Sequence, residues 1–152
     1  MLRKLVIGAT SAAALTFSTV AFAQQPQFGT ATEARTLLER AIPLVKADKA
    51  AAFAKFLSGA DGFKFLDLYV FCFNSTDGRI NVGTPEEIGK DARTFVDKGG
   101  VRFGERMLNQ AREGRIIEVG YMFPRPGSDV LVPKVSFVTK VADQICGVGY
   151  YP

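Results

Sequence analysis

The apolar positions in the first third of the chain recur every three or four residues. From residue 31 to residue 57 they form the stripe of an amphipathic helix that packs on a sheet. Pro43 interrupts this pattern, because proline lacks a backbone donor and clashes with the preceding turn. We therefore expect a kink or break near residues 43 to 48, where Asp48 is able to cap the second helical piece.

Strand patterns dominate the remainder of the chain. A fully apolar run over residues 66 to 73 ends in a polar turn at Asp77-Gly78, and a short strand is expected over residues 79 to 82. Thr84-Pro-Glu-Glu87 has the form of a capping box.

A second helix is predicted from about Val101 to Arg112 with Gly114 at its C-cap, followed by three strands over residues 115–123, 130–141 and 144–151. This order indicates an α+β domain with an antiparallel sheet.

Lys134 stands inside the predicted strand over residues 130 to 141. Because strand side chains alternate between faces, Lys134 and Ser136 share one side and Val135 and Phe137 share the other. If both faces of the sheet are covered, the ammonium must meet water or an anion in a cavity, since an unpaired buried cation is costly. If the sheet has a wet face, Lys134 is an ordinary surface lysine. The pattern alone leaves both interpretations open.

The amino end has the pattern of a Sec signal peptide. Met1 to Lys4 form a short basic region, residues 5 to 20 form an apolar core, and Ala21-Phe22-Ala23 form a cleavage site. We expect residues 1–23 to be removed, residues 24–30 to form a linker and residues 31–152 to form one domain. An uncleaved membrane anchor is the alternative, although this core is rich in small and hydroxyl residues and marginal in length for a span. The predicted location is periplasmic or secreted.

Charge and composition argue against several functions. The chain has 19 Lys and Arg against 15 Asp and Glu, and without Arg3 and Lys4 the net charge falls from +4 to +2. Because the basic residues are scattered, no nucleic-acid partner is predicted. The chain has no histidine, which excludes serine or cysteine triads of the usual kind, and no metal-ligand spacing is present. No enzyme activity, metal site or cofactor is therefore expected.

Five short segments together resemble the single Cache domain of the second type, an extracytoplasmic small-molecule sensor module of bacteria. They are the YVFCFN strand, the IGKD loop, the GYMFPRPG turn, the PKVSFV strand and the CGVGYY terminus, and the resemblance runs from about Ala31 to Tyr151. It implies a PAS-like fold in which a long N-terminal helical segment packs on a five-stranded antiparallel sheet. The pocket would lie between the sheet and the segment that links its second and third strands.

The resemblance also implies a set of ligand-binding residues. Related domains bind small molecules, often monocarboxylates, between aromatic walls and cationic or hydroxyl anchors. Carried over to this chain, Lys134 would pair with a carboxylate and Tyr121 would donate a hydroxyl, while Tyr69 and Phe71 would form walls and Arg102 is a weaker candidate. Either wall residue could instead be ordinary core. Family members often carry a histidine before the proline of the second-strand loop, where this chain has Thr84, so the ligand class stays open.

The two cysteines are the candidates for a disulfide. Exported chains favour bridges over free thiols, and the resemblance makes the first and last strands of the sheet neighbours. A bridge between Cys72 and Cys146 is then geometrically possible, with two buried thiols as the alternative.

The expected function is that of a periplasmic sensor domain for a small organic acid or similar metabolite. Nothing in the mature chain would carry a signal across a membrane, so a separate partner such as a membrane receptor or sensor kinase is expected. The alternative is a structural or interaction protein that has the Cache fold without a functional ligand pocket.

Overall fold

Two helices precede the sheet, as the spacing of apolar residues predicts. In the computed structural model, which describes residues 27–152, α1 covers Ala31–Ala47 and α2 covers Lys49–Ser58. The break falls at Asp48, whose side chain accepts a hydrogen bond from the Ala51 amide at 3.0 Å and so caps α2. Pro43 lies within α1, one turn before this break. The predicted signal peptide lies outside the described residues.

The sheet is antiparallel and has β6 near its centre. β2 and β5 flank β6, β4 pairs with β5 at one edge, and β3 pairs with β2. The five-stranded sheet implied by the resemblance is therefore present, and a two-residue strand, β1, adds a sixth beside the start of β2. The strands are β1 (Lys64–Phe65), β2 (Leu68–Asn74), β3 (Ile80–Val82), β4 (Ile117–Pro124), β5 (Leu131–Val141) and β6 (Gln144–Tyr150).

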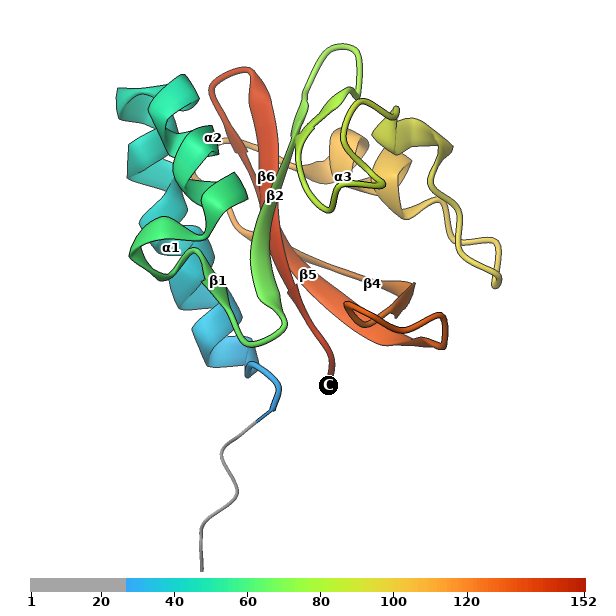
Figure 1. The fold of residues 1–152 in the computed structure, drawn as a ribbon. Coiled ribbons are helices and arrows are strands. Elements are labelled where there is room, and N and C mark those ends of the chain that lie inside the picture. The colour runs from blue at the N-terminus through green and yellow to red at the C-terminus, as the bar shows by residue number, and fades with distance from the viewer. Residues whose placement is uncertain (1–26) are drawn as a thin grey trace, which may run out of the picture.

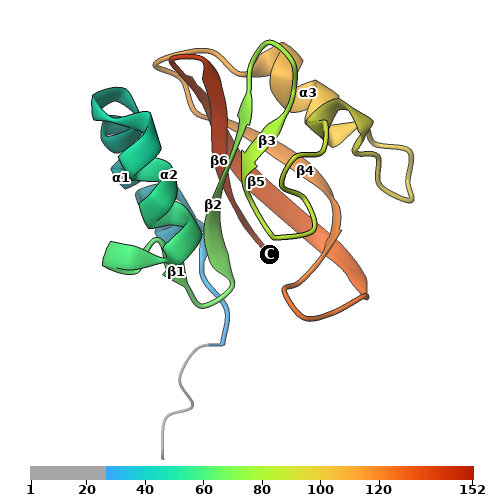
Figure 2. The ribbon, with the colours of Figure 1, turned by 45° about the horizontal axis from the view of Figure 1, so that its top comes forward.

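Both faces of the sheet are covered. Figure 1 shows α1 and α2 on one face and α3 (Phe103–Gln110) with the long segment between β3 and β4 on the other, and Figure 2 agrees. Each face has its own buried core. Phe56, Leu68 and Val148 belong to the core under α1 and α2, whereas Phe73 and Val138 belong to the core under α3. A residue of a central strand is therefore buried whichever way it points.

The segment between β3 and β4 departs from the prediction in two places. The residues around Thr84 and Glu87 make the reciprocal bond of a capping box, since the Thr84 amide donates to Glu87 at 2.8 Å, but they form a turn and no helix. A three-residue helical turn, η2 (Ala92–Thr94), follows. The next helix, α3, ends at Gln110 with Ala111 as its C-cap, so Gly114 lies beyond it in the turn that leads to β4.

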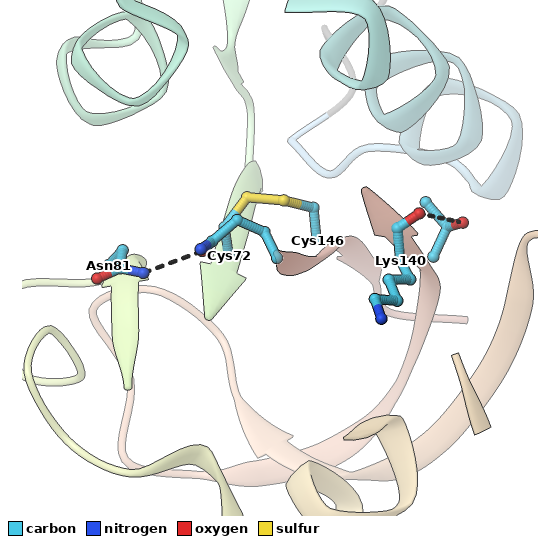
Figure 3. Close-up of a disulfide and its surroundings, with 6 residues drawn as sticks. Cys72, Asn81, Lys140 and Cys146 are labelled. Atoms are coloured by element: carbon cyan, nitrogen blue, oxygen red, sulfur yellow. Dashed lines mark hydrogen bonds between the residues drawn. A yellow bond between two sulfur atoms is a disulfide. The ribbon is translucent and has the colours of Figure 1, made fainter. Parts of the chain in front are cut away.

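The predicted bridge between the cysteines is present. Cys72 of β2 and Cys146 of β6 are direct partners in the sheet and form a disulfide. Figure 3 shows the bridge between the two strands, and both residues belong to the core under α1 and α2. The disulfide fixes the two central strands on the face opposite α3.

Candidate ligand-binding pocket

A cavity of about 30 Å³ lies between the sheet and α3. Such a volume admits a water molecule or a ligand of a few heavy atoms. Its wall is largely aromatic or aliphatic, and of the lining residues Lys134 and Glu87 carry a charge. The residues that line it are Tyr69, Phe71, Phe73, Ile80, Glu87, Ala92, Phe95, Phe103, Gly104, Met107, Tyr121, Phe123 and Lys134.

Lys134 lines this cavity, and its ammonium group lies against two other lining residues, Tyr69 and Phe123. Lys134 is only 2% exposed to solvent, so the interpretation that it is a surface lysine on a wet face of the sheet is wrong. Nζ donates to the Tyr69 hydroxyl at 3.3 Å and lies 4.9, 4.7 and 5.1 Å from the ring centres of Tyr69, Phe123 and Tyr151. We call these three rings the aromatic cage. They attract a cation through their faces, but together with one hydroxyl they leave most of its hydrogen-bonding capacity unused.

Burial also acts on the charge of this group. Desolvation lowers the pKa of Lys134 to about 8, and the negative charges of Glu87 and Asp67 oppose this effect. Among the residues that the structure describes, no carboxylate lies within 4.0 Å of the ammonium. An anionic ligand would therefore complete the surroundings of this lysine and favour its charged form.

Tyr121 lies beside Lys134 as its direct partner across β4 and β5. Its ring stacks on Phe103 at a centroid distance of 4.1 Å, and its hydroxyl lies 2.8 Å from Ser136 Oγ. Burial raises the pKa of Tyr121 well above its ordinary value, so the phenol stays protonated. When Ser136 donates the hydrogen bond of this pair, the phenol proton of Tyr121, which lines the cavity, is left for a ligand oxygen.

The structure brings four of the five predicted ligand-binding residues to one cavity. Lys134, Tyr121, Tyr69 and Phe71 all line it, whereas Arg102 does not. The Arg102 side chain is 65% exposed and bonds to Glu105 at 2.6 Å. It stands immediately before α3, where the chain has reached the surface, so Arg102 takes no part in the cavity that Lys134 lines.

Sequence reasoning missed several residues that shape the site. Phe123 could have been found, because it lies two residues after Tyr121 on the same face of β4. Tyr151 follows the last strand, where alternation no longer applies. Glu87 comes from the turn that was expected to begin a helix. No sequence pattern predicted that it lines the same cavity as Lys134.

Gly149 makes room for the lysine. It lies opposite Ser136 in the pairing of β5 and β6, and a β-carbon at this position would collide with the Lys134 side chain and come within 2.7 Å of Ser136 Oγ. The absence of a side chain at Gly149 therefore lets the stem of Lys134 lie close to β6.

A chain of contacts connects the cage to the segment before α1. The Arg125 guanidinium lies 4.7 Å from the ring centre of Tyr151 and 3.8 Å from that of Phe28. It also lies 3.5 Å from a carboxylate oxygen of Asp67, whose other oxygen accepts from the Gly29 amide at 2.7 Å. The residues that lead into α1 are thus held against the loop between β4 and β5.

The fold is shared with solved sensor domains. A methyl-accepting chemotaxis protein from Vibrio parahaemolyticus superposes with a TM-score of 0.63 at 17% identity, covering 79% of this chain and 86% of the other. A periplasmic sensor domain of a chemotaxis protein gives 0.60 at 24% identity, covering 79% and 88%. A Cache chemosensory domain, studied for its recognition of carboxylic acids, gives 0.60 at 23% identity, covering 79% and 86%.

These likenesses establish the architecture. No known family profile and no curated protein matches the sequence. At 17 to 24% identity the superpositions show that this chain shares the fold of these domains. Within residues 27–152, no helix is long and apolar enough to cross a membrane.

Proposed function

We propose that this chain is an extracytoplasmic sensor domain whose cavity binds a small carboxylate, with Lys134 as the counterion. The observation that carries the proposal is a buried ammonium that faces a cavity and has one hydroxyl as its hydrogen-bond partner. A carboxylate would supply the missing charge and acceptors, and the Tyr121–Ser136 pair would supply a further donor. The likeness to a Cache domain that recognises carboxylic acids supports the same ligand class.

The binding test compares an acid with its uncharged isostere. Propionate should raise the melting temperature of the protein and propionamide should not, because a ligand that binds the folded state stabilises it and the amide lacks the charge. A charge-assisted bond contributes about 1.5 to 3 kcal/mol, so Lys134→Met should weaken propionate binding roughly tenfold or more.

Lys140→Met is the matched control. It removes a lysine from the same face of β5 at a position that does not line the cavity, so binding should persist. Equal shifts with propionate and propionamide, or full affinity in Lys134→Met, would contradict the role of Lys134.

A structural or interaction protein with the Cache fold is the second candidate function. The small volume of the cavity favours it, because aromatic side chains already fill most of the space under α3. If no small acid changes the melting temperature at millimolar concentration, this second function is preferred.

The proposal also includes a periplasmic location and a separate membrane partner. The mature chain would begin at Gln24 in the periplasm and pass its liganded state to a separate membrane receptor or sensor kinase, as suits a fold shared with chemotaxis sensor domains. Mass spectrometry of the periplasmic protein tests the first point. Crosslinking in cell envelopes with and without propionate tests the second, since a sensor partner should be captured to a different extent in the two states.

A further inference from the structure

A second, more open cavity of about 350 Å³ adjoins the first one. The two cavities share four lining residues, Glu87, Phe95, Phe103 and Phe123, which we call the junction. Lys134 lines the inner cavity but not the outer one. A ligand with its carboxylate at Lys134 and its chain extending towards the outer cavity would place its other end at the junction.

The junction consists of three aromatic rings and one carboxylate. The ring of Phe103 lies 5.9 Å from that of Phe95 and 6.0 Å from that of Phe123, so the three rings form one cluster. Glu87 is held in place because one of its carboxylate oxygens accepts the Thr84 amide at 2.8 Å. Ring faces and a carboxylate both attract cations, and the attraction is stronger where water is partly excluded.

A simple carboxylate would meet two opposing charges in this pocket. Lys134 attracts it, but Glu87 lines the same cavity and its negative charge would repel the ligand carboxylate. A ligand with its own cation at the far end removes this conflict, because each of its charges then faces an opposite charge.

Building on the proposed function, we infer that the preferred ligand is a small zwitterion with its carboxylate at Lys134 and its ammonium at the junction. A short ω-amino acid has this chemistry. The inner cavity holds the carboxylate and the first carbon atoms, and the junction holds the amino end.

The experiment uses pairs of probes that differ in one group. β-Alanine and butyrate have the same number of heavy atoms, with an ammonium in one where the other has a methyl group. Glycine with propionate and 4-aminobutyrate with pentanoate repeat the comparison at other lengths. Calorimetric titration of the full mature chain should give an affinity at least tenfold higher for the amino acid of the best-fitting pair.

Glu87→Gln tests the assignment of the second charge. The variant should lose the preference for the amino acid and bind the plain acid at least as well, because the repulsion is gone. Glu118→Gln is the control, since Glu118 is exposed on β4 and does not line either cavity. The melting temperature of each variant without ligand shows that it is folded.

The outcomes separate this inference from the proposed function. If plain acids bind as tightly as amino acids, or if the preference survives in Glu87→Gln, the zwitterion assignment is wrong and carboxylate binding stands. If neither class of probe binds in a Lys134-dependent manner, both ideas fail.

Discussion

The buried ammonium of Lys134 should make the stability of the unliganded protein depend on pH in an unusual direction. Its pKa is about 8 in the folded chain against 10.5 for an ordinary lysine. Between these pH values the unfolded chain holds the proton and the folded chain has lost it. Because stability rises with pH wherever the unfolded state binds more protons, Lys134 contributes a rise between about pH 8 and pH 10.5.

The size of the effect follows from the two pKa values. A shift of one pKa unit corresponds to about 1.4 kcal/mol, so the full destabilisation below pH 8 is at most about 3 to 4 kcal/mol. The three rings of the cage reduce it, because they favour the charged form. Above pH 10.5 both states are neutral at this residue and the destabilisation disappears.

The assay is urea unfolding of the wild type and Lys134→Met at pH 7, 8, 9 and 10. Methionine keeps much of the apolar stem without the charge. At pH 7 the variant should be the more stable protein by up to about 3 kcal/mol, and the difference should fall below about 1 kcal/mol by pH 10. Lys140→Met controls for the loss of a lysine elsewhere on β5.

The difference between the two proteins is the quantity to follow, because tyrosines change the absolute curve. Burial raises the pKa of Tyr69 and Tyr121, so these residues reduce stability once the unfolded chain begins to ionise its tyrosines near pH 10. Both residues are present in the wild type and in the variant, and their effect cancels to first order. A difference that stays constant from pH 7 to pH 10, or a variant that is less stable at pH 7, would refute the reasoning.

Three further predictions concern other parts of the molecule. Replacing both Cys72 and Cys146 with alanine should lower the free energy of unfolding by about 4 kcal/mol, the loop-closure value for a separation of 74 residues, as measured by urea unfolding. Gly149→Ala should abolish the propionate-induced melting shift, because the new β-carbon displaces the Lys134 side chain; retained binding would argue against that close approach. Asp67→Ala should cost about 1 to 3 kcal/mol by leaving the buried Gly29 amide unpaired, and hydrogen exchange at that amide should accelerate; unchanged protection would mean that the Asp67 bond does not hold this segment.

Much of the fold could be predicted from local patterns. The three-four spacing before residue 58 gave the helices, and Asp48 marked the break because aspartate is a strong N-cap. The segment around Thr84 shows the limit of local signals. One of the two bonds of its capping box forms, but the chain turns towards the pocket instead of continuing as a helix, because tertiary contacts outweigh a motif of four residues.

The candidate site could be predicted only in part, because its cage is assembled across the sheet. Tyr69, Phe123 and Lys134 come from three different strands, and Tyr151 follows a fourth. Alternation along β5 assigns Lys134 to a face, but whether that face is wet depends on the segment between β3 and β4, which has little regular structure of its own. The neighbours of Lys134 therefore decide what its charge indicates. An ammonium that contacts three rings and one hydroxyl lacks a counterion and further hydrogen-bond acceptors, and a ligand carboxylate would supply both.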